Sequence, residues 1–204
     1  MNWLQIVTSW KCKLYISKKF KVEINEILLN FRIAKNGDFL YNIVVMNKRK
    51  LKVYLDNCCF NRPFDDQMQL SISLETQSKL VIQELIRRNK LVLYTSFMLY
   101  QEISDNPYEY KRTAIKVFVE NYESYYIGLK NKDNIWNKAK QIMLSDIKEK
   151  DAIHISCAIY QKCDAFITTD KRLMKYDNKE IKIYNPIEFI NHLEEIGYEW
   201  YSKW

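Results

Sequence analysis

The chain has 204 residues, of which 48% are hydrophobic and 28% are charged. This is the composition of a globular protein with a sizeable core, and it excludes a disordered, collagen-like or low-complexity chain. Because only three Gly and three Pro occur, there is no room for a flexible Gly- or Pro-rich linker.

The net charge of +7 is concentrated near the N-terminus. Residues 1–50 carry ten Lys or Arg and three Asp or Glu, whereas residues 51–204 carry 22 residues of each sign. A basic surface is a common sign of nucleic-acid binding, but most of this chain is neutral overall. The charge therefore says little about the partner.

The cysteines and the apolar runs indicate the compartment. The five cysteines are an odd number and include the adjacent pair Cys58 and Cys59, which makes a poor disulfide framework. The first residues lack the basic region and full apolar core of a secretory signal. No apolar run approaches the ~20 residues that span a bilayer. We therefore expect a cytoplasmic protein with no membrane association.

Residues 1–50 form a basic N-terminal extension whose pattern does not define a structure. Two interpretations stay open. The extension is a natural part of the protein, or translation begins at Met46, where a basic lead precedes the first strong strand pattern. An intact-mass measurement of the native protein distinguishes them, because a mass for all 204 residues contradicts the second.

From Leu51 onward, short apolar runs alternate with longer amphipathic stretches. The apolar runs predict strands at 51–55, 91–95, 125–129, 165–169 and 181–184. The amphipathic stretches predict helices at 68–89, 97–105, 108–123, 133–144, from Asp151 onward and at 186–195. Segment 57–63 is predicted as a turn-rich loop, and Ser96 as the N-cap of the second helix.

This alternation implies βαβ units and a parallel sheet. We predict a three-layer α/β/α domain with a central, mainly parallel sheet over residues 51–198. An aromatic tail, residues 199–204, follows it. We expect the tail to dock onto the body of the protein or onto a dimer partner, or to stack on bases.

Four carboxylates are associated with the predicted strands. Asp56 follows the first strand, Glu102 lies on the helix after the second, Asp151 opens a helix, and Asp170 follows the fourth strand. The carboxyl ends of parallel strands meet at one edge, where open α/β sheets bind ligands, so these side chains can converge. Converging carboxylates raise one another's pKa unless a cation neutralises them. Oxygen ligands favour Mg²⁺ or Mn²⁺ over zinc, and such a site suits metal-assisted hydrolysis.

The motifs around these acids resemble those of the PIN-domain family of metal-dependent nucleases, over residues 51–176. They read Val53-Tyr-Leu-Asp-Asn57, Leu99-Tyr-Gln-Glu-Ile103, Lys150-Asp-Ala-Ile-His154 with Ala158, and Phe166-Ile-Thr-Thr-Asp170. The acid after the first strand and the closing Thr-Thr-Asp are specific together, whereas the Glu motif alone is not. Cys58 and Cys59 replace the aliphatic continuation that is commoner after the first acid.

The resemblance implies a PIN-like endoribonuclease that hydrolyses single-stranded RNA. It implies that the four acids Asp56, Glu102, Asp151 and Asp170 are catalytic and hold one or two Mg²⁺ or Mn²⁺ ions. It also implies that Asn57 and Thr168 support the cluster. Many members are toxins of bacterial toxin–antitoxin pairs, so an antitoxin protein is an implied partner, and we expect a homodimer.

Several neighbouring side chains admit two interpretations. His154 lies on the helix face of Asp151, where it supports the site or packs in the core. A zinc site with Cys157 or Cys163 is a weaker alternative, because the spacing matches no zinc signature. Arg62, Lys171 and Arg172 flank the acids, so they contact phosphates or are merely solvated. Cys58 and Cys59 are small buried apolar residues or reactive thiols.

Each acid taken alone also has a purely structural explanation. Asp56 suits a turn, Asp151 a helix N-terminus, Asp170 a cap for the next turn, and Glu102 a solvated helix face. Only their joint placement favours a metal site. The alternative function is a catalytically silent PIN-fold module that binds RNA or a protein, since a motif does not prove turnover.

Overall fold

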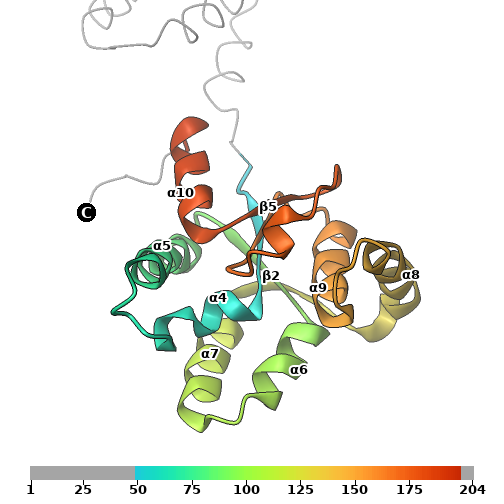
Figure 1. Cartoon of the computed structure of the whole chain (residues 1–204), viewed down its shortest axis with the longest axis horizontal. Coiled ribbons are helices and arrows are strands. Elements are labelled where there is room, and N and C mark those ends of the chain that lie inside the picture. Colours follow the sequence, from blue (N-terminus) through green and yellow to red (C-terminus); the bar gives the residue numbers. More distant parts are fainter. Residues whose placement is uncertain (1–48, 199–204) are drawn as a thin grey trace, which may run out of the picture. The chain divides into compact units, whose positions relative to one another are not determined.

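The structure is a computed structural model, and it describes residues 49–198 (Figure 1). The extension up to residue 48, with its alternative start at Met46, and the tail 199–204 lie outside the described residues. The strands are β1 (Lys52–Leu55), β2 (Val92–Ser96), β3 (Glu123–Ile127), β4 (Ala165–Ile167) and β5 (Lys182–Tyr184). The helices are α4 (Asn57–Asn61), α5 (Leu70–Arg87), α6 (Phe97–Asp105), α7 (Glu109–Tyr122), α8 (Lys132–Met143), α9 (Glu149–Tyr160) and α10 (Pro186–Glu195). Short 3₁₀ helices are η2 (Arg62–Phe64), η3 (Leu129–Asn131) and η4 (Leu173–Lys175).

The five strands form one sheet in the order β3-β2-β1-β4-β5, and all neighbours pair in parallel. The chain builds outward from β1 to β3 and then crosses back to place β4 on the other side of β1. The strand order therefore reverses between β1 and β4, the position where open parallel sheets bind ligands. Asp56 and Asp170 come soon after these two strands.

Helices cover both faces of the sheet, which confirms the predicted three-layer α/β/α class. Successive strand residues point to opposite faces, so Val53 and Leu55 belong to one buried cluster and Tyr54 to another. The first cluster packs α5, α7 and α10 on the sheet, together with the apolar side of α6. The second packs α8 and α9 on the opposite face. Figure 1 shows α5 and α10 on one side of the strands and α8 and α9 on the other.

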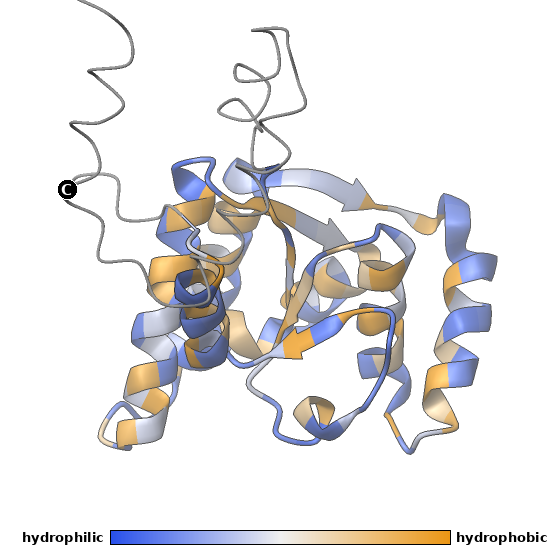
Figure 2. Ribbon diagram, turned by 90° about the horizontal axis from the view of Figure 1, so that it is seen from above, coloured by the Kyte–Doolittle hydropathy of each residue, from blue (hydrophilic) through white to orange (hydrophobic). Residues whose placement is uncertain are grey.

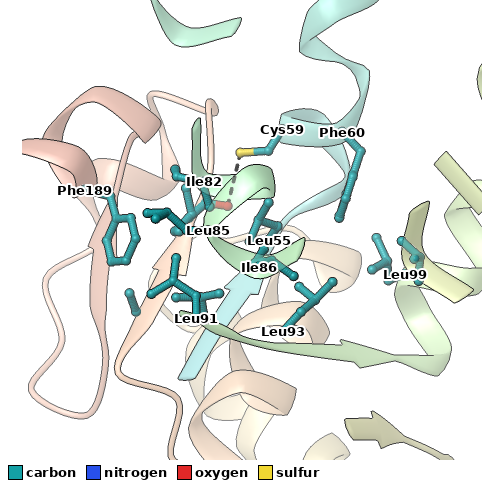
Figure 3. Close-up of a cluster of buried hydrophobic side chains, with 14 of the residues drawn as sticks. Leu55, Cys59, Phe60, Ile82, Leu85, Ile86, Leu91, Leu93, Leu99 and Phe189 are labelled. Carbon is teal, nitrogen blue, oxygen red and sulfur yellow. Dashed lines mark hydrogen bonds between the residues drawn. The ribbon is translucent and has the colours of Figure 1, made fainter. Parts of the chain in front are cut away.

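The first cluster is almost purely apolar. Figure 3 shows Ile82 and Leu85 of α5 beside Leu55 of β1 and Phe189 of α10. Cys59 belongs to this cluster, and its thiol donates to the carbonyl of Ile167 at 3.3 Å. The helices that cover the sheet carry hydrophobic and hydrophilic residues on different sides (Figure 2), as their sequence periodicity predicts.

The predicted elements agree with the structure to within about two residues at most ends. One prediction was wrong. Segment 57–63 is helical rather than a loop, because Asp56 accepts from the amide of Asn57 at 2.7 Å and caps the short helix α4. The prediction that Asp151 lies at the start of its helix is confirmed, since α9 begins at Glu149 and Asp151 is in its first turn. The N-cap prediction for Ser96 is confirmed by a 3.3 Å bond from the amide of Leu99.

No helix among residues 49–198 is both long and apolar enough to cross a membrane.

Candidate metal centre at the carboxyl edge of the sheet

Asp56 stands where β1 passes into α4, and only 5% of the residue is exposed. Its backbone amide continues the ladder with β4, donating to the carbonyl of Ile167 at 2.9 Å. Its carboxylate accepts from three groups: the amide of Asn57 at 2.7 Å, the hydroxyl of Thr168 at 2.8 Å and the thiol of Cys58 at 3.0 Å. A buried carboxylate needs such donors, and together they fix its orientation.

Glu102 and His154 form the second part of the site. Glu102 lies on α6, and its Oε2 is 3.0 Å from Nε2 of His154 on α9. The His154 side chain is completely buried. Burial alone would raise the pKa of Glu102, but the hydrogen bond and the electrostatic interaction with the His154 imidazole, with smaller contributions from Lys150 and Asn57, hold it below its usual value.

Asp56, Glu102 and His154 come together tightly. Each offers one ligand atom, and these atoms lie within 4.8 Å of one another. In the part of the chain that the structure describes, no cysteine joins this group. The alternative zinc site of His154 with Cys157 or Cys163 is therefore not the arrangement that the fold builds.

Asp151 and Asp170 border this group rather than join it. Burial raises the pKa of Asp151, and the charges of Asp56 and Asp170 raise it further. Asp170 is held by Arg172, whose guanidinium lies 2.5 Å from Oδ2 and 3.2 Å from Oδ1. These hydrogen bonds lower the pKa of Asp170. The four predicted acids thus lie at one edge, where Asp56 and Asp170 act on Asp151, while the most compact group of possible ligand atoms is that of Asp56, Glu102 and His154.

The supporting residues also lie at this edge. Thr168 donates to Asp56 and accepts from the amide of Asp170 at 3.0 Å, so it links the two acids that follow β1 and β4. Asn57 accepts from the side-chain amide of Asn61 at 3.2 Å, and its hydrogen bond also helps to lower the pKa of Glu102.

The three cations predicted to contact phosphates are placed differently. Arg62 lies 2.8 Å from Glu75 and 3.0 Å from Asp65, and it reaches the carbonyl of Thr169 at 3.4 Å. The exposed Arg172 pairs with Asp170 and is 3.9 Å from Asp151. Lys171 is exposed. The two arginines are thus engaged by acids, and a phosphate would compete with those acids.

The sequence interpretation did not predict the contacts that two residues, Cys58 and Tyr54, make at the site. Cys59 is buried as predicted, but Cys58 is only half-buried. Its sulfur donates to Asp56, lies 3.2 Å from Thr168 and accepts from the amide of Thr169 at 3.2 Å. The hydroxyl of Tyr54 is hydrogen-bonded to Nδ1 of His154 at 2.7 Å. The position of Cys58 beside Asp56 was a signal for the first, whereas nothing local marks Tyr54.

The donor set fits a divalent cation. Two carboxylates converge, with the imidazole of His154 hydrogen-bonded to one of them, and two further carboxylates lie beside them with a like-charge effect on the pKa of Asp151. Sets of carboxylate oxygens accommodate Mn²⁺ as well as Mg²⁺. A cation would remove the repulsion that the acids now exert on one another.

Comparison with known proteins does not assign this chain to a family. No protein-family model matches the chain, and no curated protein matches it. A chain from the crystal structure of VapBC2 from Rickettsia felis, bound to a DNA fragment from their promoter, is similar in structure. It is 12% identical, with a TM-score of 0.44, over 66% of this chain and 100% of that chain. The functional interpretation therefore depends on the residues of this chain.

Proposed function

We propose that this protein is a PIN-like, metal-dependent endoribonuclease that hydrolyses phosphodiester bonds of single-stranded RNA. The observation that supports it most is the convergence of Asp56, Glu102 and His154, with ligand atoms within 4.8 Å, where the strand order reverses. This position and the four motifs that resemble the PIN family point to the same acids.

In this proposal Asp56, Glu102, Asp151 and Asp170 hold Mg²⁺ or Mn²⁺. A bound divalent ion supplies Lewis-acid chemistry, which lowers the pKa of a water and stabilises charge on a phosphate. Thr168 and Cys58 keep Asp56 in one orientation through their hydrogen bonds. Burial and the charges of Asp56 and Asp170 raise the pKa of Asp151, and a neighbouring cation would oppose that rise.

The biological setting is a further part of the proposal. The family resemblance supports the toxin of a toxin–antitoxin pair, with an antitoxin protein as partner, a homodimer and a cytoplasmic location. Arg62, Lys171 and Arg172 are the candidates for phosphate contacts once their acidic partners are engaged by a cation.

The first test needs no RNA. Thermal unfolding of the full, metal-free chain is followed against Mn²⁺ for the wild type, for Asp56→Asn and for Asp133→Asn, which changes an exposed acid in the first turn of α8. At about 100 times the dissociation constant, a specific site adds about 2.7 kcal/mol of stability. We expect this gain in the wild type and Asp133→Asn, and its loss in Asp56→Asn.

Cleavage of a single-stranded RNA oligonucleotide is the second test. Asp56→Asn and Asp170→Asn should abolish cleavage while circular dichroism shows an intact fold. Undiminished cleavage by either variant contradicts the site.

One observation favours the catalytically silent module as a second candidate. Arg172 engages both carboxylate oxygens of Asp170, and this guanidinium competes with a cation for that ligand. Mn²⁺ that stabilises neither the wild type nor Asp56→Asn, with no cleavage of RNA, would favour the silent module.

A further inference from the structure

A buried chain of hydrogen bonds runs from the candidate metal centre back into the sheet. Nε2 of His154 lies 3.0 Å from Oε2 of Glu102, and its Nδ1 lies 2.7 Å from the hydroxyl of Tyr54. The Tyr54 hydroxyl lies 2.5 Å from Oγ of Ser96, which accepts from the amide of Leu99 at 3.3 Å. His154, Tyr54 and Ser96 are all 0% exposed.

One assignment of the protons satisfies every group of this chain. An ionised carboxylate only accepts, so the bond to Glu102 requires a proton on Nε2 of His154. At the other end, Ser96 accepts from Leu99, and in this assignment its own proton goes to Tyr54. Tyr54 then donates its single proton to Nδ1 of His154, and every group is satisfied, as buried polar groups need to be.

We infer that Tyr54 and Ser96 are positioning residues of the metal centre, which orient His154 so that its Nε2–H donates to Oε2 of Glu102 and thereby fixes that oxygen. The other oxygen of Glu102 makes no hydrogen bond to His154 and stays available to a cation. This inference rests on the proposed metal site. It adds two uncharged residues, Tyr54 and Ser96, to the four acids that the motifs predict.

Rigid elements make the chain an effective support. Tyr54 is in the central strand β1, stacked on Phe166 of β4 at a centroid distance of 5.5 Å, and Ser96 is the N-cap of α6, the helix that carries Glu102. The chain thus connects β1, α9 and α6 at three points. Groups behind a ligand set its orientation, and their loss commonly lowers metal affinity 10–100-fold.

The first experiment tests the tautomer without any metal. Two-bond ¹H–¹⁵N correlation spectra of the ¹⁵N-labelled full chain report which ring nitrogen carries the proton, and the sequence has only two histidines. His192→Gln assigns the signals of His154. We expect a protonated Nε2 and an unprotonated Nδ1 in the wild type, and a change of this pattern in Tyr54→Phe. A protonated Nδ1 in the wild type overturns this assignment of the protons.

The second experiment measures the dissociation constant of Mn²⁺ for the wild type, Tyr54→Phe and Tyr94→Phe. Tyr94 is the matched control, because it pairs with Tyr54 in the sheet register, packs in the same cluster and is 4% exposed. Tyr54→Phe should weaken Mn²⁺ binding by about 10-fold or more, while Tyr94→Phe binds like the wild type.

The outcomes separate the two proposals. Equal Mn²⁺ affinity of Tyr54→Phe and the wild type overturns this inference and leaves the metal site standing. A loss of equal size in Tyr94→Phe also overturns it, because it would indicate a general disturbance of the sheet. Failure of the wild type to bind Mn²⁺ overturns the proposed function and this inference with it. If Tyr54→Phe does not fold, Ser96→Gly, which keeps a residue suited to an N-cap, must give the weakened binding.

Discussion

The two faces of the sheet are built for different tasks. On the face under α5, α7 and α10, side chains such as Leu55, Ile82 and Phe189 pack without hydrogen bonds of their own (Figure 3). On the face under α8 and α9, the buried Tyr54 and His154 are hydrogen-bonded to each other, and His154 reaches the candidate metal centre. One face supplies stability through apolar burial, and the other also fixes the orientation of a functional group.

The comparison predicts that stability and metal binding respond to different substitutions. Ile82→Ala deletes a 0% exposed side chain on the apolar face. It should lower the free energy of unfolding by about 2–5 kcal/mol, because lost burial and a cavity add up. Urea unfolding measures this loss, and the Mn²⁺ affinity of the folded protein should stay within about twofold. Leu80→Ala, at a 49% exposed position on the same helix, is the control and should cost much less. A large change in Mn²⁺ affinity would break the division between the faces.

Lys79 is the exception on the apolar face. It is 5% exposed, its ammonium lies 5.7 Å from the centre of the Phe60 ring, and burial lowers its pKa from 10.5 to about 8. Lys79→Met keeps the apolar stem and removes the charge. We expect it to stabilise the protein at pH 7 by about 1–3 kcal/mol, because each pKa unit corresponds to about 1.4 kcal/mol.

The pH dependence of the free energy of unfolding tests the role of Lys79. Between pH 8 and 10.5 the unfolded chain binds more protons at Lys79 than the folded protein does, so stability rises with pH in that window. Lys79→Met should lose this rise, while Lys116→Met, at an exposed position of α7, should keep it. Urea unfolding at pH 7, 8.5 and 10 measures both. An unchanged rise in Lys79→Met would show that Lys79 is not the group responsible.

The smallest expected effect on stability compares two helix caps. Ser96→Ala removes the N-cap of α6, and Asn185→Ala removes the capping box of α10 on the apolar face. Each should cost about 1 kcal/mol of stability. Only Ser96→Ala should also weaken Mn²⁺ binding, because Ser96 belongs to the hydrogen-bonded chain that leads through Tyr54 and His154 to Glu102. Equal Mn²⁺ affinities in the two variants would contradict a special role for Ser96.

Much of this architecture is determined by the sequence alone. The alternation of strands and helices follows from apolar periodicity, which depends only on which residues are near in the chain. The same reasoning places Asp56 and Asp170 at one edge, because parallel strands end together. The N-cap at Ser96 is equally local, and so is the start of α10 at Pro186.

Only the tertiary structure decided which side chains face one another. Tyr54 and His154 are 100 residues apart in the sequence, and Glu102 and His154 are 52 apart. Their contacts depend on the order of the strands and on the packing of α6 against α9, which no local pattern encodes. The same reason explains why Arg172 pairs with Asp170 and why His154 lies beside Glu102. The sequence thus determined the edge at which the chemistry lies, whereas the fold determined the ligand set, because ligand geometry arises from contacts between distant segments.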